Sequence, residues 1–367
     1  MSEHLCADPL WPCAMCGAVS CLSGFEGLEV VIHGSSGCYF YPASLIGRPI
    51  HSTLLIEEEV IFGSAERLRL TVEGVGASGQ PIAVVQTCVP AVTGEDFGAM
   101  LDGGQVLLVD SPGFAGGMEE GYRRAIEALE PRVDPDQTGV TIDGLNPMDP
   151  FWRGNLLEAE RLIRRAGGRV ATAIAADRFE TLKHCGQYVV STNPGLSCGI
   201  GESAGNLLGL GATIAAFCCL ADRNELDASP IIQEAEEAGG RIERACDKYL
   251  SRSDPPSVAI FAEEAYAGYA ADTLRRYLDA EIVVCAPRTG PDAVTSLAEV
   301  RELIDDGQPD LILGSTYEQA AAPGIPYVPL TFPQRGRIRL HARPIVGIEG
   351  TLSLMDDVLT ACGGRGS

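Results

Sequence analysis

Short apolar runs alternate with helix-like stretches along this chain, and this alternation limits its fold more than any other feature. Parallel strands need a crossover segment between them, so the alternation favours parallel sheets. The clearest set predicts a strand, a helix and a strand at Ser257 to Ala262, Tyr269 to Leu278 and Glu281 to Cys285. Further strands are predicted at Leu28 to His33, Ile82 to Thr87, Gln105 to Asp110, from Val140, Arg169 to Ile174, Asp310 to Leu313 and Pro326 to Leu330, and further helices at Gly117 to Leu129, Asn155 to Ala166 and Leu297 to Asp305. The fold class is therefore α/β.

The alternation falls into three repeating α/β units. We place them at residues 1–136, 137–250 and 251–367. The second boundary lies in the segment SRSDPPS, from Ser251 to Ser257, whose Ser and Pro residues are typical of a linker. A chain of 367 residues is long enough for two or three domains, each with its own core.

Three cysteines in the first quarter of the chain each adjoin a glycine-rich turn. Cys38 ends the segment HGSSGC, Cys88 opens CVPAVTGED, and Cys13 begins CAMCGA. Cys38 and Cys88 closely follow predicted strands, and ligands of open parallel sheets bind at the carboxyl ends of strands. Iron–sulfur clusters usually take four thiolates per cubane, so three imply a fourth ligand, most simply from a second polypeptide. Spacing alone equally allows buried thiols at strand ends.

Composition excludes several classes of partner. The formal net charge is −23, which argues against binding to nucleic acid or to an anionic membrane surface. No run approaches the roughly 20 apolar residues that span a bilayer, and the start MSEHLCADPLWPC does not resemble a signal peptide. We therefore expect a cytoplasmic protein. The reducing cytosol argues against disulfides among its 13 cysteines.

The segments around Cys13, Cys38 and Cys88 resemble motifs of a known family, the nitrogenase component 1 superfamily. The segment CAMCGAVSCLSGFEGLEVVIHGSSGC, from Cys13 to Cys38, looks like its N-terminal cluster motif, closest to the β-type subunit. CVPAVTGED resembles its second cluster motif, in which Gly94 and an acidic pair follow the cysteine. Similar matches are IEEEVIFGSAERL from Ile56, VDSPGFAGGMEEGYRRAI from Val109, PDLILGSTYE from Pro309 and RPIVGIEGTLSLMDDVL from Arg343.

The resemblance implies three Rossmann-like parallel-sheet domains and pairing with a homologous component 1 subunit, as a homodimer or a heterotetramer. It also implies that Cys13, Cys38 and Cys88 hold an iron–sulfur cluster shared across the subunit interface, either a four-iron cubane or a P-cluster type. Gly37 and Gly94 are then cofactor-binding positions. The electron donor would be an ATP-dependent iron protein. This chain has no Gly-x-x-x-x-Gly-Lys-Ser/Thr loop, so it is not that ATPase.

The function implied is that of an oxidoreductase subunit, which relays electrons from the iron protein through the cluster to a substrate or a second cofactor. Two alternatives are the reductive cyclase component of methanogen nickel-tetrapyrrole biosynthesis and a non-catalytic scaffold for metallocofactor assembly. The chain is shorter than nitrogenase subunits, and a cysteine–histidine pair for a second cofactor has no clear equivalent. Adjacent His184 and Cys185, or Cys198, are candidates for that role. Cys16 is a further candidate cluster ligand; Cys16 and Cys21 are otherwise core thiols.

Overall fold

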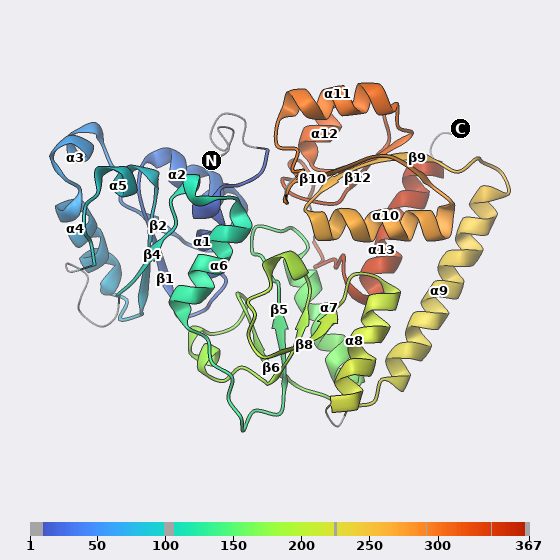
Figure 1. Cartoon of the computed structure of the whole chain (residues 1–367), viewed down its shortest axis with the longest axis horizontal. Helices are drawn as coiled ribbons and strands as arrows, with labels where there is room; N and C mark the ends of the chain where they lie inside the picture. Colours follow the sequence, from blue (N-terminus) through green and yellow to red (C-terminus); the bar gives the residue numbers. More distant parts are fainter. Residues whose placement is uncertain (1–9, 99–105, 224–225, 291, 339, 364–367) are drawn as a thin grey trace. The chain divides into compact units, whose positions relative to one another are not determined.

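A computed structural model describes residues 10–98, 106–223, 226–290, 292–338 and 340–363 (Figure 1). Within them the chain forms three four-stranded sheets, and the strand pairs whose register is defined are parallel. The α/β fold predicted from the sequence is confirmed. The chain divides into two compact units, of which the first holds Met1–Gln137, Leu145–Met148 and Thr172–Gly186, and the second holds the remainder.

The first sheet has the strand order β2-β1-β3-β4. Its strands are β1 (Glu29–His33), β2 (His51–Ser52), β3 (Ile82–Gln86) and β4 (Val106–Asp110). The helices of this unit are α1 (Ala14–Ser23), α2 (Ser36–Leu45), α3 (Glu57–Phe62), α4 (Ala65–Gly76), α5 (Cys88–Thr93), η1 (Gly113–Ala115), α6 (Met118–Leu129) and η2 (Phe179–Lys183). On one face of the sheet, Val31 and Val84 pack with Leu68 of α4 and with Phe97.

The helices α1 and α6 of the first unit pack with their backbones almost in contact. A β-carbon on Gly17 would lie 1.8 Å from the carbonyl oxygen of Met118, and one on Gly121 would lie 1.6 Å from that of Ala14. Only glycine fits such an approach. The N–H of Ala14 also donates to the carbonyl oxygen of Gly116 over 3.0 Å. These contacts fix the start of α1 against the loop that follows β4.

The second sheet has the order β6-β5-β7-β8. Its strands are β5 (Val140–Asp143), β6 (Val170–Ala173), β7 (Tyr188–Ser191) and β8 (Glu202–Asn206), accompanied by α7 (Trp152–Arg165), η3 (Pro194–Leu196) and α8 (Leu210–Arg223). The last turn of α7 closes through Gly167, whose φ of +84° is the left-handed conformation of a helix C-cap, and the N–H of Gly168 returns to the carbonyl oxygen of Ile163. The helix ends at Arg165, one residue before the end that the sequence predicts.

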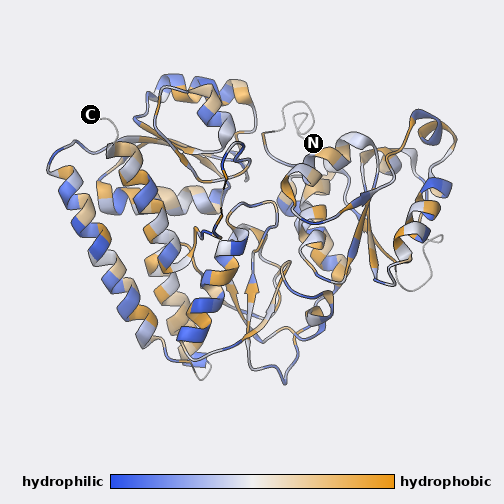
Figure 2. Ribbon diagram, turned by 180° about the vertical axis from the view of Figure 1, so that it is seen from behind, coloured by the Kyte–Doolittle hydropathy of each residue, from blue (hydrophilic) through white to orange (hydrophobic). Residues whose placement is uncertain are grey.

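The third sheet has the order β10-β9-β11-β12. Its strands are β9 (Ser257–Ala262), β10 (Glu281–Pro287), β11 (Leu311–Gly314) and β12 (Tyr327–Pro329), and its helices are α9 (Ser229–Leu250), α10 (Glu264–Leu278), α11 (Leu297–Gly307), α12 (Thr316–Ala321) and α13 (Gly347–Gly363). Helix α10 covers one face of this sheet, and α11 with α12 covers the other (Figure 1). The strands are mostly hydrophobic, whereas α9 alternates between hydrophilic and hydrophobic residues (Figure 2).

All three sheets share one strand order, with the first strand of each flanked by the second and the third. The chain therefore reverses its winding between β1 and β3, between β5 and β7, and between β9 and β11. Open parallel sheets bind ligands at such switch points, beyond the carboxyl ends of the strands. Each of these three positions is therefore a candidate for a ligand site.

The predicted strands and helices match the observed ones within a few residues, although α10 begins at Glu264 and not at Tyr269. The division into three domains with boundaries after residues 136 and 250 stays a prediction, because compactness alone yields two units. In the described part of the chain, no helix is both long and apolar enough to span a bilayer. The first nine residues, on which the expectation about a signal peptide largely depends, lie outside the described residues.

Candidate functional site

The three cysteines singled out in the sequence each lie at the beginning of a helix in the first unit. Cys13 is the N-cap of α1, Cys38 is in the first turn of α2, and Cys88 is the first residue of α5. Helices α2 and α5 follow β1 and β3, so Cys38 and Cys88 flank the switch point of the first sheet. All three thiols are free and half-buried.

Gly113 brings two of these cysteines together. A β-carbon on this glycine would lie 3.1 Å from Cys13 Sγ and 3.1 Å from Cys88 Sγ, so the two sulfurs are at most twice that distance apart. The N–H of Gly113 donates to Cys88 Sγ over 3.0 Å. The two sulfurs therefore face the same short loop, which follows β4 and can accommodate them only because residue 113 has no side chain.

Cys38 completes the group. Burial raises the pKa of its thiol, and the negative charges that Cys13 and Cys88 carry as thiolates raise it further. Ser35 Oγ donates to Cys38 Sγ over 3.8 Å and, with Thr87, lowers the pKa in partial compensation. Cys38 is therefore within electrostatic reach of both other cysteines, at the same edge of the first sheet as Cys88.

The surroundings of Cys13 favour the thiolate form of its side chain. Its pKa is lowered to about 6, first by a hydrogen bond from the Cys16 thiol, against the opposing effect of burial, and also by the N–H groups of Cys16 and Met15. These N–H groups lie in the first turn of α1, where unpaired donors and the helix dipole favour a negative charge. Thiolates, not thiols, are the ligands of iron. The start of α1 thus favours the thiolate form of Cys13, which is the form that can bind a metal.

The site fits a multinuclear cluster better than a single ion. In the described ranges, no three Cys, His, Asp or Glu side chains converge closely enough to hold one metal ion. A cubane carries its irons at separate corners, so the thiolates that bind it surround a larger body. One buried hydroxyl, Ser111 Oγ, borders the cysteine loops and makes no hydrogen bond of ordinary geometry with described residues. The donor set and this hydroxyl fit a bound sulfide-rich group.

The two glycines predicted to bind the cofactor have no close contact with the cysteine sulfurs. Gly94 closes α5 with a φ of +71°, and a β-carbon there would meet open space. A β-carbon on Gly37 would meet only Ser35 Oγ, at 3.9 Å. Backbone conformation thus explains Gly94, and the binding roles of both glycines stay predictions. Sequence reasoning missed Gly113, although the segment VDSPGFAGG that contains it was recognised as a motif.

His33 lies beside this site and is neutral. It is buried at the end of β1, where Nδ1 is 3.2 Å from Thr53 Oγ1 and Nε2 is 3.1 Å from Ser64 Oγ. Burial lowers its pKa to about 4, against the attraction of Glu95 and Glu59. Ser64 Oγ in turn donates to Glu95 over 2.8 Å. These contacts give His33 a structural role in joining the loops around the cysteines.

The candidates for a second cofactor do not converge. His184 Nδ1 pairs with Asp134 at 2.8 Å, whereas the thiol of adjacent Cys185 is buried and donates to the carbonyl oxygen of Leu182. Cys198 follows β7 in the second unit, and its thiol donates over 2.9 Å to Asp143, a buried carboxylate at the end of β5. A thiol that donates to a carboxylate is not free to act as a thiolate ligand.

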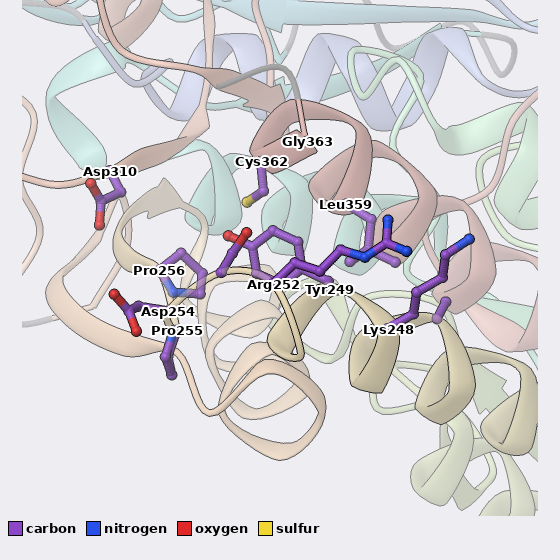
Figure 3. A pocket seen from close by; sticks show the side chains of 12 residues that line it. Lys248, Tyr249, Arg252, Asp254, Pro255, Pro256, Asp310, Leu359, Cys362 and Gly363 are labelled. Carbon is purple, nitrogen blue, oxygen red and sulfur yellow. The ribbon is translucent and has the colours of Figure 1, made fainter. Parts of the chain in front are cut away.

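A cavity of about 840 Å³ lies elsewhere in the second unit (Figure 3). It is bordered by the last turn of α9, the linker before β9 and the end of α13, and Lys248, Arg252 and Cys362 line it. Asp310 and Pro256 place the cavity at the amino ends of β11 and β9. Parallel sheets bind ligands at the opposite ends of their strands. This cavity therefore does not coincide with the candidate site.

The sequence pattern of nitrogenase component 1 type oxidoreductases matches residues 13–191 and 197–362 of the chain, including all three cysteines. The chain belongs to the nitrogenase component 1 family. The solved structure "Nitrogenase Cp1 at pH 6.5" superposes with a TM-score of 0.78 over 100% of this chain and 95% of that one, at 16% identity. This agreement confirms the fold of the family, with three parallel sheets.

Relatives of the component 1 family differ in their roles. A nitrogenase iron-molybdenum cofactor biosynthesis protein NifE of Clostridium pasteurianum is 25% identical, over 84% of this chain and 76% of its own length. A nitrogenase molybdenum-iron protein beta chain of Frankia alni is 30% identical over 45% of this chain, but the match spans only 36% of that protein. A NifN of Rhodobacter capsulatus is 28% identical over 44% of this chain and 40% of its own length. These relatives thus include both a nitrogenase subunit and cofactor biosynthesis proteins.

Proposed function

We propose that this chain is the iron–sulfur subunit of a nitrogenase-like, two-component reductase. It would receive electrons from an ATP-dependent iron protein and pass them to a substrate or a second cofactor. The cluster would be a four-iron cubane or a P-cluster type, held by Cys13, Cys38 and Cys88 where a homologous subunit meets the chain. The observation that carries this proposal is the approach of Cys13 and Cys88 to one side of Gly113, next to Cys38.

Bound at this position, an iron–sulfur cluster supplies one-electron transfer. The residues of the chain would then set how easily it accepts an electron. The N–H of Gly113 donates to Cys88 Sγ and so reduces the electron density on that thiolate, which favours the reduced state. The first turn of α1 acts in the same direction on Cys13, through the N–H groups of Met15 and Cys16.

The surface around the cysteines supports a role for protein partners. Five large apolar side chains on helices that follow strands of the first sheet are solvent-exposed, and we call them the apolar rim: Phe40, Ile61, Phe62, Val92 and Phe114. They belong to α2, α3, α5 and η1, which all follow carboxyl ends of strands in the first sheet or the loops between them. Exposed apolar groups gathered at one edge are typical of protein–protein contact sites. A covering partner would also keep water from the cluster.

A second candidate function is supported by one observation. One relative that matches 84% of this chain and 76% of its own length is named as a cofactor biosynthesis protein and not as a nitrogenase subunit. A scaffold of this kind would hold an iron–sulfur cluster at the same three cysteines but release it to an acceptor protein. The two functions thus share a site and differ in what leaves it, an electron or the cluster.

The first experiment tests the site. The protein is purified without oxygen, iron and sulfide are measured per chain, and the EPR spectrum is recorded. About two irons per chain would fit a shared cubane and about four a P-cluster type. Cys38→Ala and Cys88→Ala should each lose the spectrum and most of the iron, whereas Cys285→Ala, at an exposed cysteine of the second unit, should keep both. Full iron content in the first two variants would refute the proposal.

The second experiment separates relay from scaffold. The loaded protein is mixed with a nitrogenase-type iron protein, dithionite and ATP, and then with an iron-free acceptor. A relay becomes reduced only when ATP is present and keeps its iron. A scaffold transfers iron and sulfide to the acceptor and loses its own spectrum in proportion. ATP-dependent reduction with no loss of iron supports the relay, and cluster transfer overturns it.

A further inference from the structure

The hydroxyl of Ser111 is buried beside the cysteine loops without a partner. Ser111 directly follows β4, its side chain is fully buried, and Oγ makes no hydrogen bond of ordinary geometry with any residue that the structure describes. A buried hydroxyl left unpaired costs free energy, and nearly all such groups in native proteins are paired. Ser111 Oγ is therefore available as a donor to a group bound next to it.

The backbone at Ser111 extends the first sheet by one residue. Its N–H donates over 3.3 Å to the carbonyl oxygen of Gln86, which continues the parallel register between Gln86 and Asp110. Side chains of a strand alternate between the two faces of a sheet. Val106 and Leu108 of β4 pack on the face that carries α4, so the side chain of Ser111 belongs to the opposite face. That face carries α1 and α6 (Figure 1).

The first cysteine lies on the same face and at the same end of the sheet. Helix α1 leads into β1 through a short turn, so it runs against the strands, and its N-cap Cys13 lies at their carboxyl ends. Gly113, two residues after Ser111, lies against Cys13 Sγ and Cys88 Sγ, and its N–H donates to Cys88 Sγ. The unpaired hydroxyl thus belongs to the loop that already contacts two of the candidate ligands.

We propose that Ser111 Oγ donates a hydrogen bond to a sulfur of the iron–sulfur cluster, and that this bond makes the cluster easier to reduce. The inference rests on the proposed function and extends it, because the cysteines would hold the cluster and Ser111 would help to set its potential. A hydrogen bond to a cluster sulfur withdraws electron density from iron and so favours the reduced state. Burial strengthens such a bond, because the local dielectric constant is low.

The test compares Ser111→Ala with Ser23→Ala in the iron-loaded protein, purified without oxygen. Ser23 is also buried, but it is the last residue of α1, and its Oγ donates to the carbonyl oxygen of Ser20 over 3.0 Å. Iron per chain is measured, and a redox titration followed by EPR gives the potential of the clusters that are bound.

Removing the hydroxyl should make the cluster harder to reduce. At the wild-type midpoint, the ratio of reduced to oxidised cluster should be about tenfold lower in Ser111→Ala, which corresponds to a potential about 59 mV lower for a one-electron couple. Ser23→Ala should titrate as the wild type does. Pulsed EPR spectra of the reduced cluster in H₂O and D₂O should show one exchangeable proton coupling fewer in Ser111→Ala than in either other protein.

Unfolding of the iron-free proteins distinguishes this role from a structural one. Alanine at position 111 removes a buried hydroxyl that has no partner, so iron-free Ser111→Ala should be at least as stable as the wild type. Ser23→Ala loses a hydrogen bond and should be slightly less stable. If Ser111→Ala is destabilised as much as Ser23→Ala, the hydroxyl has a partner within the protein, and the inference is wrong.

The remaining outcomes separate this inference from the proposed function. If Ser111→Ala keeps the wild-type potential and proton couplings, Ser111 does not donate to the cluster, whereas the three-cysteine site stands. If Cys38→Ala keeps its iron, the proposed function fails first. A lowered potential in Ser111→Ala, with wild-type behaviour of Ser23→Ala and loss of iron in Cys38→Ala, supports both.

Discussion

The N–H of Gly113 donates to Cys88 Sγ over 3.0 Å, in a loop that also lies against Cys13 Sγ. One residue without a side chain thus contacts two of the three candidate ligands. The loop is held in place by the packing of α1 on α6 and by the hydrogen bond from Ala14 to Gly116. The geometry of the site therefore depends on backbone contacts. A substitution at Gly113 should displace the cysteine sulfurs and so weaken metal binding.

Gly113→Ala should lower cluster occupancy. The new methyl group would lie 3.1 Å from both Cys13 Sγ and Cys88 Sγ, closer than most carbon–sulfur contacts allow, so at least one sulfur must move. We expect iron per chain to fall at least about twofold, because ligand positions tolerate only small displacements. Gly74→Ala on α4 is the matched control, since a β-carbon there meets open space. Equal iron content in the two variants would show that the loop does not border the cluster.

Phe62→Ala should weaken binding of the iron protein without affecting the cluster. Ile61 and Phe62 at the end of α3 are 73% and 86% exposed, and the same helix begins with three glutamates, Glu57 to Glu59. This combination suits a partner with an apolar centre and basic surroundings. Truncating an apolar contact at the centre of an interface costs more than about 1 kcal/mol, so affinity should drop roughly tenfold.

The control for Phe62 is Leu70→Ala on α4, which removes a side chain that is 52% exposed outside the apolar rim. Affinity is measured by anaerobic titration with the iron protein, and iron per chain is recorded for each variant. Identical affinities for Phe62→Ala and Leu70→Ala would rule out α3 as a docking element. Raising the salt concentration should slow association if the glutamates attract a basic partner.

The sequence predicted the fold well because its signals are local. Strands such as β3 and β9 are uninterrupted apolar runs, and α6 shows its buried stripe of Tyr122, Ile126 and Leu129 in the helical periodicity of the sequence. The start of α10 was placed five residues late, because Glu264 to Gly268 include small residues that carry little periodic signal.

The site was less predictable, because contacts across the fold decide it. Cys38 and Cys88 were placed at strand ends correctly, but nothing local shows that Gly113 faces the sulfurs of Cys13 and Cys88. The partners of His33 are equally distant in the sequence: the hydroxyls of Thr53 and Ser64 contact its two ring nitrogens.

Arg288→Met should destabilise the second unit strongly. Arg288, just after β10, pairs with Glu318 of α12, and both side chains are fully buried. Glu318 is also the acceptor for the N–H and Oγ of Ser315, at 2.6 and 2.8 Å. Removing the cation leaves a buried carboxylate without its counter-charge, which typically costs about 3–5 kcal/mol of unfolding free energy.

Chemical denaturation followed by circular dichroism measures this loss. The control is Arg69→Met, whose exposed ion pairs with Glu66 and Glu73 should contribute very little. The double variant Arg288→Met with Glu318→Leu should regain part of the stability, because no uncompensated charge then stays buried. A single variant as stable as the Arg69 control would show that water reaches the pair.

His33→Gln should flatten the dependence of stability on pH. Burial lowers the pKa of His33 from 6.5 to about 4. Between pH 6.5 and pH 4, His33 is therefore protonated in the unfolded chain but neutral in the folded chain. Stability from this residue is thus complete above pH 6.5 and is lost as the pH falls towards 4. Between pH 7 and 5 the wild type should lose about 2 kcal/mol more unfolding free energy than the variant.

Urea unfolding at several pH values measures how the unfolding free energy depends on pH. The control is His51→Gln, at a partly exposed histidine. If wild type and His33→Gln lose stability in parallel as the pH falls, the ring becomes protonated without unfolding. Water would then reach His33, and the loops around the cysteines would be more open than their hydrogen bonds imply.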